Sequence, residues 1–259
     1  MMENGELYRL HDEPNQRLSS PPPPPTVRIF CDFDGTVIDE DVGDAFFSAF
    51  VGPTWEEDNR AYREGRRGAR ETFERYTSRM MGLTAERIHA WLRTYRVHSS
   101  FPPFVHAMQM RKFPVEIVSD GLDAYILPLL AEVGVSVPVI ANHLLIREDG
   151  TCRVLSPYAD ETCTVCGTCK RNHIMVSSGE HDTIVLVGDG ISDFCAAEIA
   201  DVVFARSELE KFCRQRNITF RRYFTFDDIL SEMEKLCRRR SFPHPRRAAL
   251  SRASVWRSG

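Results

Sequence analysis

The chain has 259 residues, of which 42% are hydrophobic and 27% are charged, and its formal net charge is −4. This length allows one large domain or a core domain with an insertion, and the weak charge excludes a general affinity for nucleic acid or anionic membranes. There is no run of 18 apolar residues to predict a membrane span, and the N-terminus does not look like a secretory signal. We therefore expect a cytoplasmic protein whose eight cysteines are reduced thiols or metal ligands rather than disulfides.

Two terminal segments differ in composition from the rest of the chain. Residues 1–25 are polar and end in five prolines, which predicts a disordered proline-rich arm. A passive spacer is a better interpretation of this arm than a ligand for a partner protein. Residues 241–259 are rich in arginine and contain no acidic residue, so we expect a basic disordered tail.

Between these segments, strand-like and helix-like patterns alternate. Short runs rich in valine and isoleucine predict buried strands at 27–33, 114–119, 183–189 and 201–205. Helical patterns follow at 122–134, 192–200, 207–216 and 226–239. This alternation predicts an α/β fold with a parallel sheet.

The stretch from residue 41 to residue 110 breaks this alternation. It contains helical patterns and no convincing strand, so we expect a small helical cap inserted into the core. The core is then expected at 26–40 and 111–240. Within it, residues 143–155 resemble a β-hairpin that turns at Asp149 and Gly150.

Polar residues stand at the ends of three predicted strands. Alternation in an extended chain points Asp32 and Asp34 to the same side, where two carboxylates repel by roughly 2–4 kcal/mol at an effective dielectric of about 20. The carboxyl ends of parallel strands are where such sheets bind ligands, and Asp189 follows another of these strands. Since Mg²⁺ prefers oxygen ligands, Asp32, Asp34 and Asp189 are predicted to hold this ion.

A metal beside a carboxylate suggests phosphoryl transfer. Asp32 would attack phosphorus and form an aspartyl-phosphate, while Asp34 would protonate the leaving oxygen and later activate water. Charge that develops on the phosphoryl oxygens needs donors, and the candidates are Ser119, Gly121 and Lys170. Helix N-capping alone would explain isolated aspartates, but it explains poorly the ordered series "DFDGT", "SDG" and "GDGISD".

These motifs resemble those of the haloacid dehalogenase superfamily of Mg²⁺-dependent phosphatases. "DFDGT" is similar to motif one, Ser119 to motif two, Lys170 to motif three and "GDGISD" to motif four. The resemblance implies a Rossmann-like core with a helical cap after motif one. It further implies that Asp32 is the nucleophile and a metal ligand, and that Asp34 is the acid/base, whose backbone carbonyl binds metal. By the same resemblance, Asp189 is a metal ligand, and Asp193 binds metal or orients its water.

The substrate expected from this resemblance is a small phosphate ester. The branch with phosphoserine phosphatase looks most similar, yet Asp41 stands where those enzymes usually carry a glutamate that holds the substrate ammonium. "CTVCGTCKRNHI" and "DVVFARSELEKFCRQRNI" resemble the 2-hydroxy-3-keto-5-methylthiopentenyl-1-phosphate phosphatases of methionine salvage, which is our first choice. "DFDGTVIDED" is also similar to phosphocholine and phosphoethanolamine phosphatases, so these substrates and phosphoserine stay as alternatives, with Asp41 as a candidate substrate contact.

Three cysteines directly precede Lys170. Cys163, Cys166 and Cys169 have the spacing C-x₂-C-x₂-C, which is compatible with structural Zn²⁺, although reduced thiols without metal explain them as well. A redox switch is disfavoured, because nothing in the sequence indicates a lowered thiol pKa. A non-catalytic adaptor stapled by these cysteines is the alternative of another class, but such a protein should have lost a motif residue and none is missing.

Overall fold

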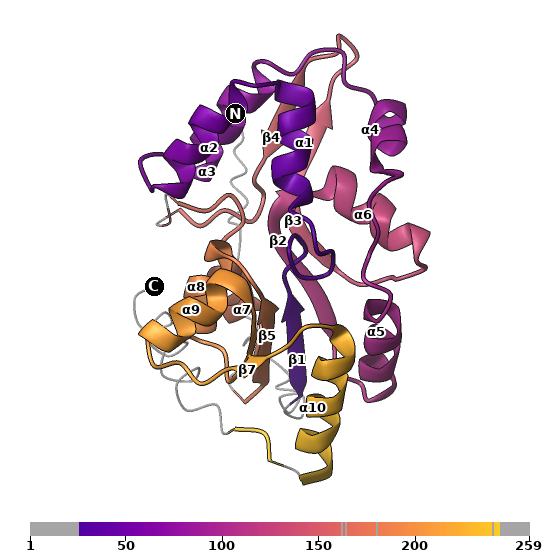
Figure 1. Ribbon diagram of the computed structural model, residues 1–259, viewed down its shortest axis with the longest axis vertical. Helices are drawn as coiled ribbons and strands as arrows, with labels where there is room; N and C mark the ends of the chain where they lie inside the picture. Colours follow the sequence, from indigo (N-terminus) through magenta and orange to yellow (C-terminus); the bar gives the residue numbers. More distant parts are fainter. Residues whose placement is uncertain (1–25, 162, 164, 180, 240, 244–259) are drawn as a thin grey trace, which may run out of the picture.

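The computed structural model describes residues 26–161, 163, 165–179, 181–239 and 241–243, which form a sheet flanked by helices with further helices beyond one end of it (Figure 1). The predicted proline-rich arm and nearly all of the predicted basic tail lie outside these residues. Within them, no helix is both long enough and apolar enough to cross a membrane.

Seven strands in the described part of the chain form one sheet in the order β4-β3-β2-β1-β5-β6-β7. Their bounds are β1 Val27–Cys31, β2 Val115–Leu122, β3 Val139–Ile146, β4 Cys152–Leu155, β5 Thr183–Gly188, β6 Val202–Ala205 and β7 Arg221–Arg222. Neighbouring strands run parallel except β3 and β4, which form the predicted antiparallel hairpin. The predicted α/β fold with a mainly parallel sheet is therefore confirmed.

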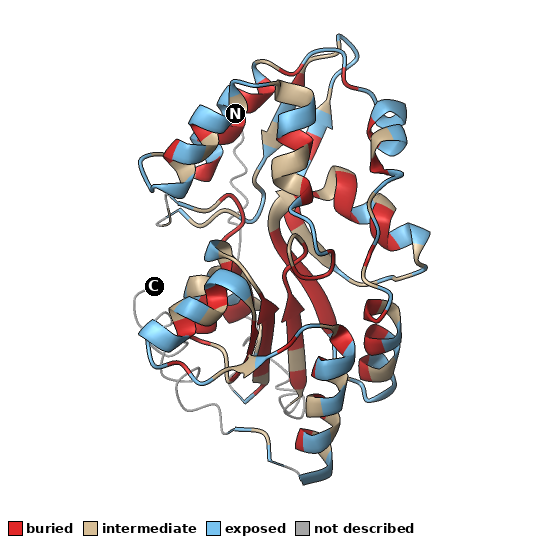
Figure 2. Cartoon of the chain, in the orientation of Figure 1, coloured by how far each residue is buried: buried red, intermediate tan, exposed pale blue. Residues whose placement is uncertain are grey.

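Helices cover both faces of this sheet. On one face lie α5 Phe101–Met110, α6 Asp123–Glu132 and α10 Phe226–Arg239; on the other lie α7 Lys170–Ser177, α8 Phe194–Ala197 and α9 Ser207–Gln215, with the 3₁₀ turn η1 Ile191–Asp193 before α8. Successive side chains of a strand point to opposite faces, so Ile29 packs into one apolar cluster and Phe30 into the other. This double coverage explains why the central strands are buried almost throughout (Figure 2) and why their sequences are continuously apolar.

Four helices follow β1: α1 Val42–Val51, α2 Trp55–Arg63, α3 Ala69–Thr77 and α4 Ala85–Leu92. Helices α1 to α3 pack on one another beyond the carboxyl end of β1 (Figure 1), and α3 also packs against β4. Met81 forms an isolated antiparallel bridge with Thr151 in the hairpin. The hairpin of the core thus supports the layer of helices above the sheet.

The last helix of the predicted cap segment packs on the core. Helix α5 contacts β2 and α10, and its Phe101 and Phe104 rings lie 4.8 and 5.2 Å from the ring of Phe226 in α10. The fully buried aromatic faces of α5 need this apolar partner. We therefore propose that the cap ends before α5 rather than at residue 110.

A buried carboxylate joins α2 to α3. Asp58 is 2% exposed, and its side chain accepts hydrogen bonds from three arginines of the following segment, Arg67, Arg75 and Arg79. Burial alone would raise the pKa of Asp58, but the hydrogen bonds from the arginines outweigh it and hold this pKa below its usual range. This network of ion pairs holds α2 against the segment that contains α3.

Candidate active site

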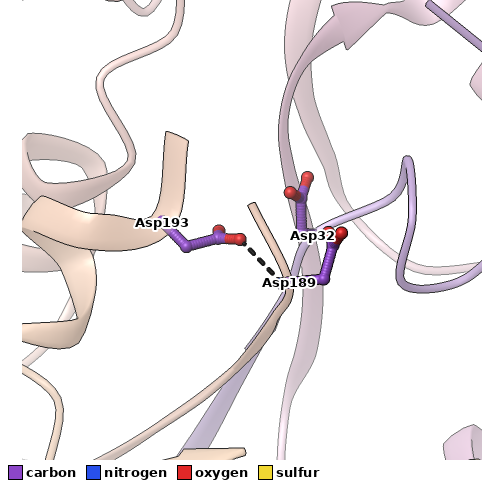
Figure 3. Close-up of side chains that lie close together, drawn as sticks. All are labelled: Asp32, Asp189 and Asp193. Carbon is purple, nitrogen blue, oxygen red and sulfur yellow. Dashed lines mark hydrogen bonds between the residues drawn. The ribbon is translucent and has the colours of Figure 1, made fainter. Parts of the chain in front are cut away.

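Three carboxylates meet at the carboxyl end of the sheet. Asp32 follows β1, Asp189 follows β5, and Asp193 ends the η1 turn (Figure 3). One carboxylate oxygen from each lies within 4.8 Å of the others, and no other group of three or more such ligands occurs among the described residues. Pairing of β1 with β5 brings the first two together, as the sequence predicts for adjacent parallel strands.

One buried lysine pairs with two of these carboxylates. The Nζ atom of Lys170, the first residue of α7, lies 2.7 Å from Asp32 Oδ2 and 2.7 Å from Asp193 Oδ1. Burial, followed by the charge of Asp193, raises the pKa of Asp32 well above its usual range and that of Asp189 to about 7. The pKa of Lys170 is raised, because Asp193 and Asp32 outweigh the opposing effect of burial.

The site therefore has more buried negative charge than its own cation balances. A set of three convergent carboxylate oxygens is the donor chemistry that suits Mg²⁺, so Asp32, Asp189 and Asp193 fit the expected ion. The side chain of Asp34 is not a member of this group. Its expected contact with metal through the backbone carbonyl stays a prediction.

The Asp34 carboxyl is held by donors from two directions. Its Oδ1 accepts from the backbone amides of Val42 (3.0 Å) and Gly43 (3.2 Å), and its Oδ2 accepts from the Tyr125 hydroxyl (2.6 Å). Burial and then the charge of Asp41 raise the pKa of Asp34 to about 7. Sequence reasoning did not find Tyr125, because it falls within an ordinary helical pattern.

Two glycines allow this crowding. A Cβ atom on Gly121 would lie 2.0 Å from the Tyr125 hydroxyl and 2.7 Å from Asp34 Oδ2. Gly35 has φ +67°, and a Cβ there would lie 2.5 Å from Asp189 Oδ2. The Gly121 amide itself donates to the Ser119 Oγ at 3.0 Å, so the two predicted phosphate donors lie together at the end of β2.

Asp120 connects three parts of the site. Its Oδ1 accepts from the amides of Gly167 (3.0 Å) and Thr168 (2.8 Å), in the loop that leads to Lys170. Its Oδ2 accepts from the hydroxyl of Tyr62 in α2, at 3.0 Å. Sequence reasoning did not assign these contacts to Asp120, since none of its partners is near it in the chain.

A cavity of about 360 Å³ opens between the sheet end and the helices above it. Its walls include Asp32, Asp34, Asp41, Ser119, Gly121 and Asp189, together with Phe47, Phe73 and Tyr76. Asp41 caps α1 by accepting from the Asp44 amide at 2.8 Å, and its other oxygen lies 3.7 Å from Arg63. Phe46 and Met80, by contrast, are fully buried in the core and do not line the cavity.

The zinc site that the cysteine spacing allowed is not supported. Cys163, Cys166 and Cys169 are all described, yet their sulfur atoms do not form a group of three ligands within 4.8 Å. The spacing is compatible with zinc, but a tetrahedral thiolate site needs a closer convergence of ligands.

Comparison with known families gives the class. The family model of haloacid dehalogenase-like hydrolases matches residues 29–198, which include all four motifs. The chain belongs to the haloacid dehalogenase-like hydrolases, and it is an enzyme of that class.

Curated relatives share most of its length. A 2-hydroxy-3-keto-5-methylthiopentenyl-1-phosphate phosphatase of Exiguobacterium sp. is 30% identical over 207 residues, which cover 79% of this chain and 95% of the relative. The enzyme of the same name from Geobacillus kaustophilus is 31% identical, with 78% and 93% covered.

Solved structures show the same fold. A phospho-aspartyl intermediate analogue of phosphoserine phosphatase superposes with a TM-score of 0.60 at 16% identity, covering 80% of this chain and 99% of the other. A probable phosphoserine phosphatase from Vibrio cholerae gives a TM-score of 0.63 at 16% identity, with 84% and 69% covered.

Proposed function

We propose that the protein hydrolyses a small phosphate monoester, with Asp32 as the nucleophile. The observation that carries this proposal is the placement of the Asp32 carboxylate. It stands at the end of β1, 2.7 Å from Lys170, on the wall of a cavity of about 360 Å³. A phosphate ester in this cavity would therefore meet a nucleophile that is itself paired with a buried cation.

The reaction has two displacements. Asp32 attacks phosphorus, the ester bond breaks, and Asp34 gives its proton to the departing oxygen. A water molecule then attacks phosphorus while Asp34 takes its proton, which releases phosphate and restores the Asp32 carboxylate. Lys170 and the Ser119 hydroxyl stabilise the charge that develops on the phosphoryl oxygens, with the Gly121 amide as a further donor.

Asp32, Asp189 and Asp193 would hold Mg²⁺. The bound ion would supply the positive charge that these carboxylates lack and would polarise a phosphoryl oxygen. Lys170 would supply a second positive charge, since its Nζ lies 2.7 Å from Asp32 Oδ2 and 2.7 Å from Asp193 Oδ1.

The substrate that we propose is 2-hydroxy-3-keto-5-methylthiopentenyl-1-phosphate, the compound in the names of the relatives. A phosphate at Asp32 leaves the rest of the molecule facing an aromatic wall of Phe47, Phe73 and Tyr76. An apolar wall gains about 0.8 kcal/mol per buried methylene, so the methylthio group should favour this substrate by roughly tenfold to a hundredfold.

A second candidate follows from the carboxylate of Asp41 on the same cavity. Together with the ring of Tyr76 it offers an acidic and aromatic surface for phosphocholine or phosphoethanolamine. Phosphoserine is the fourth ester to compare, because Asp41 could also face its ammonium.

A panel of these four esters with Mg²⁺ tests the proposal on the full chain. We expect the highest kcat/KM for the methylthio enol phosphate, and Phe47→Ala should reduce that preference while leaving phosphoserine hydrolysis little changed. Phe50→Ala is the matched control, because Phe50 packs on the core and does not line the cavity. A kcat/KM for phosphocholine far above the others, reduced by Asp41→Asn, would replace the first substrate with the second.

A further inference from the structure

Tyr125 is a buried residue of the site to which the proposed hydrolysis assigns no task. It lies in the first turn of α6, it is fully buried, and it lines the cavity. Its ring packs with its centre 6.1 Å from the ring centres of both Phe33 and Phe46, which restricts the direction of the hydroxyl. The hydroxyl donates to Asp34 Oδ2 at 2.6 Å. A helix of the core therefore holds one oxygen of the expected acid/base.

The hydrogen bonds of Asp34 leave one place for a proton. A carboxylate has about four lone-pair positions, two on each oxygen. The backbone amides of Val42 and Gly43 occupy both positions of Oδ1, at 3.0 and 3.2 Å. The Tyr125 hydroxyl occupies one position of Oδ2. The position left over is on Oδ2, so a proton carried by Asp34 would be on the oxygen that Tyr125 holds.

Glycines at two positions make room for the Tyr125 hydroxyl. A Cβ atom on Gly43 would lie 3.0 Å from it, and one on Gly121 would lie 2.0 Å from it and 2.7 Å from Asp34 Oδ2. A larger residue at position 121 would therefore push the hydroxyl away from Asp34. Because Gly121 is also an expected phosphate donor, Oδ2 lies beside the place where the ester would bind.

We propose that Asp34 delivers its proton from Oδ2 and that Tyr125 is the positioning residue that directs this oxygen at the departing group, an inference that rests on the proposed function. As Asp32 forms its bond to phosphorus, the bond between phosphorus and the ester oxygen breaks. The ester oxygen keeps the electron pair and takes the Oδ2 proton, so the alcohol leaves neutral and Asp34 becomes a carboxylate. The Tyr125 hydroxyl keeps its own proton and stabilises the charge that forms on Oδ2.

The need for this proton depends on the leaving group, which gives the test. Phenyl phosphate releases a phenol with a pKa of about 10, whose oxygen needs a proton, whereas 2,4-dinitrophenyl phosphate releases an anion that is stable without one. With Mg²⁺ present, kcat/KM reports cleavage of the ester and not the later attack by water. In Tyr125→Phe, which keeps the ring, kcat/KM should fall about tenfold to a hundredfold for phenyl phosphate and less than about threefold for the dinitrophenyl ester.

A double-mutant cycle separates positioning of Asp34 from a general disturbance of the site. Asp34→Asn should itself lower kcat/KM for phenyl phosphate by about 10²–10⁴-fold. In that background Tyr125→Phe should not change the ratio of the two kcat/KM values any further, because the hydroxyl acts through Asp34. The ratio does not depend on the fraction of folded protein, since both esters are measured on one preparation.

Tyr223→Phe is the matched control. Tyr223 is also a buried tyrosine, but its hydroxyl donates to Thr36 Oγ1 at 3.4 Å and to the Gly188 carbonyl at 3.3 Å rather than to Asp34. Its substitution should leave the ratio of the two kcat/KM values at the parent value.

Three results would overturn the inference: an equal loss on both esters in Tyr125→Phe, an equal change of the ratio in Tyr223→Phe, or an effect of Tyr125→Phe on the ratio that persists with Asp34→Asn. If the parent hydrolysed neither ester, the proposed function and this inference would fail together. If the parent is active and only the ratio fails to respond, this inference fails and the proposed function stands, so the two failures are distinguishable.

Discussion

The sheet end and the helical layer above it each bury acidic side chains, but they balance the charge in opposite ways. In the helical layer, one carboxylate, Asp58, pairs with three arginines, and its pKa lies below the usual range. At the sheet end, three carboxylates converge and one lysine, Lys170, pairs with two of them. The pKa values of Asp32 and Asp189 lie above their usual range.

The difference separates a structural ion network from a binding site. Carboxylate oxygens within 4.8 Å of one another repel by roughly 3 kcal/mol at an effective dielectric of about 20. The chain could have relieved this repulsion with a further basic residue, as it does at Asp58. An acidic excess at a cavity is therefore a surplus that a bound cation can neutralise, whereas Asp58 already has its partners.

The largest effect should come from Asp32→Asn, which tests the functional half of this comparison. Turnover should fall by at least about 10⁴-fold, because the nucleophile is lost. The melting temperature should stay unchanged or rise, because the substitution removes repulsion with Asp189 and Asp193. Phosphate release and thermal melts measure both quantities. Hydrolysis of an aryl phosphate at the parent rate would refute the role of Asp32.

Metal removal directly tests the excess of negative charge at the sheet end. A chelator should abolish turnover, and Mg²⁺ should restore it. At a concentration of 100 times its dissociation constant, the ion should also stabilise the fold by about 2.7 kcal/mol. The Asp189→Asn variant should lose most of this thermal shift and Asp58→Asn should keep it. Full turnover after exhaustive chelation would contradict the proposed metal dependence.

Asp58→Asn tests whether the ion network in the helical layer stabilises the fold. Three arginines would lose a charged acceptor, so unfolding should become easier by about 2–3 kcal/mol, which is roughly 4–12 °C in melting temperature. Glu71→Gln is the control, since the exposed Glu71 also pairs with Arg67 and its loss should change stability by about 0.5 kcal/mol or less.

The pH dependence of this effect has a definite sign. A carboxyl whose pKa is lower in the folded state stabilises the fold fully above its unfolded pKa of about 3.9 and loses that contribution as pH falls through the folded pKa. The gap between the parent and Asp58→Asn should therefore be constant at neutral pH and shrink below about pH 4. Chemical denaturation at several pH values measures it, and an undiminished gap at strongly acidic pH would mean that charge is not its source.

The smallest effect concerns the hydrogen bond that joins the two regions. Tyr62→Phe removes the donor to Asp120 and keeps the ring, so the change should be worth about 0.5–1.5 kcal/mol, or roughly twofold to tenfold in kcat/KM. Steady-state kinetics beside a thermal melt distinguish a role in the site from one in stability alone. An unchanged kcat/KM with a lowered melting temperature would assign this bond to stability.

Much of the fold could be predicted because buried parallel strands carry continuous apolar runs. β1, β2, β5 and β6 were found in this way, as was the hairpin from its Asp149-Gly150 turn. The beginning of β3 at Val139 was not predicted, since Pro138 precedes a short apolar run there. β7 was also missed, because two arginines have no strand signal.

Sequence patterns are enough to predict which chemical groups reach the sheet end. Asp32, Ser119 and Asp189 lie within or just after strands, and parallel pairing brings such positions together whatever the rest of the chain does. The partner of each group, in contrast, depends on tertiary packing. The bonds from Tyr125 to Asp34 and from Tyr62 to Asp120 join residues 91 and 58 positions apart. Side chains so distant in sequence leave no periodic or local pattern, because their contact depends on how whole helices dock.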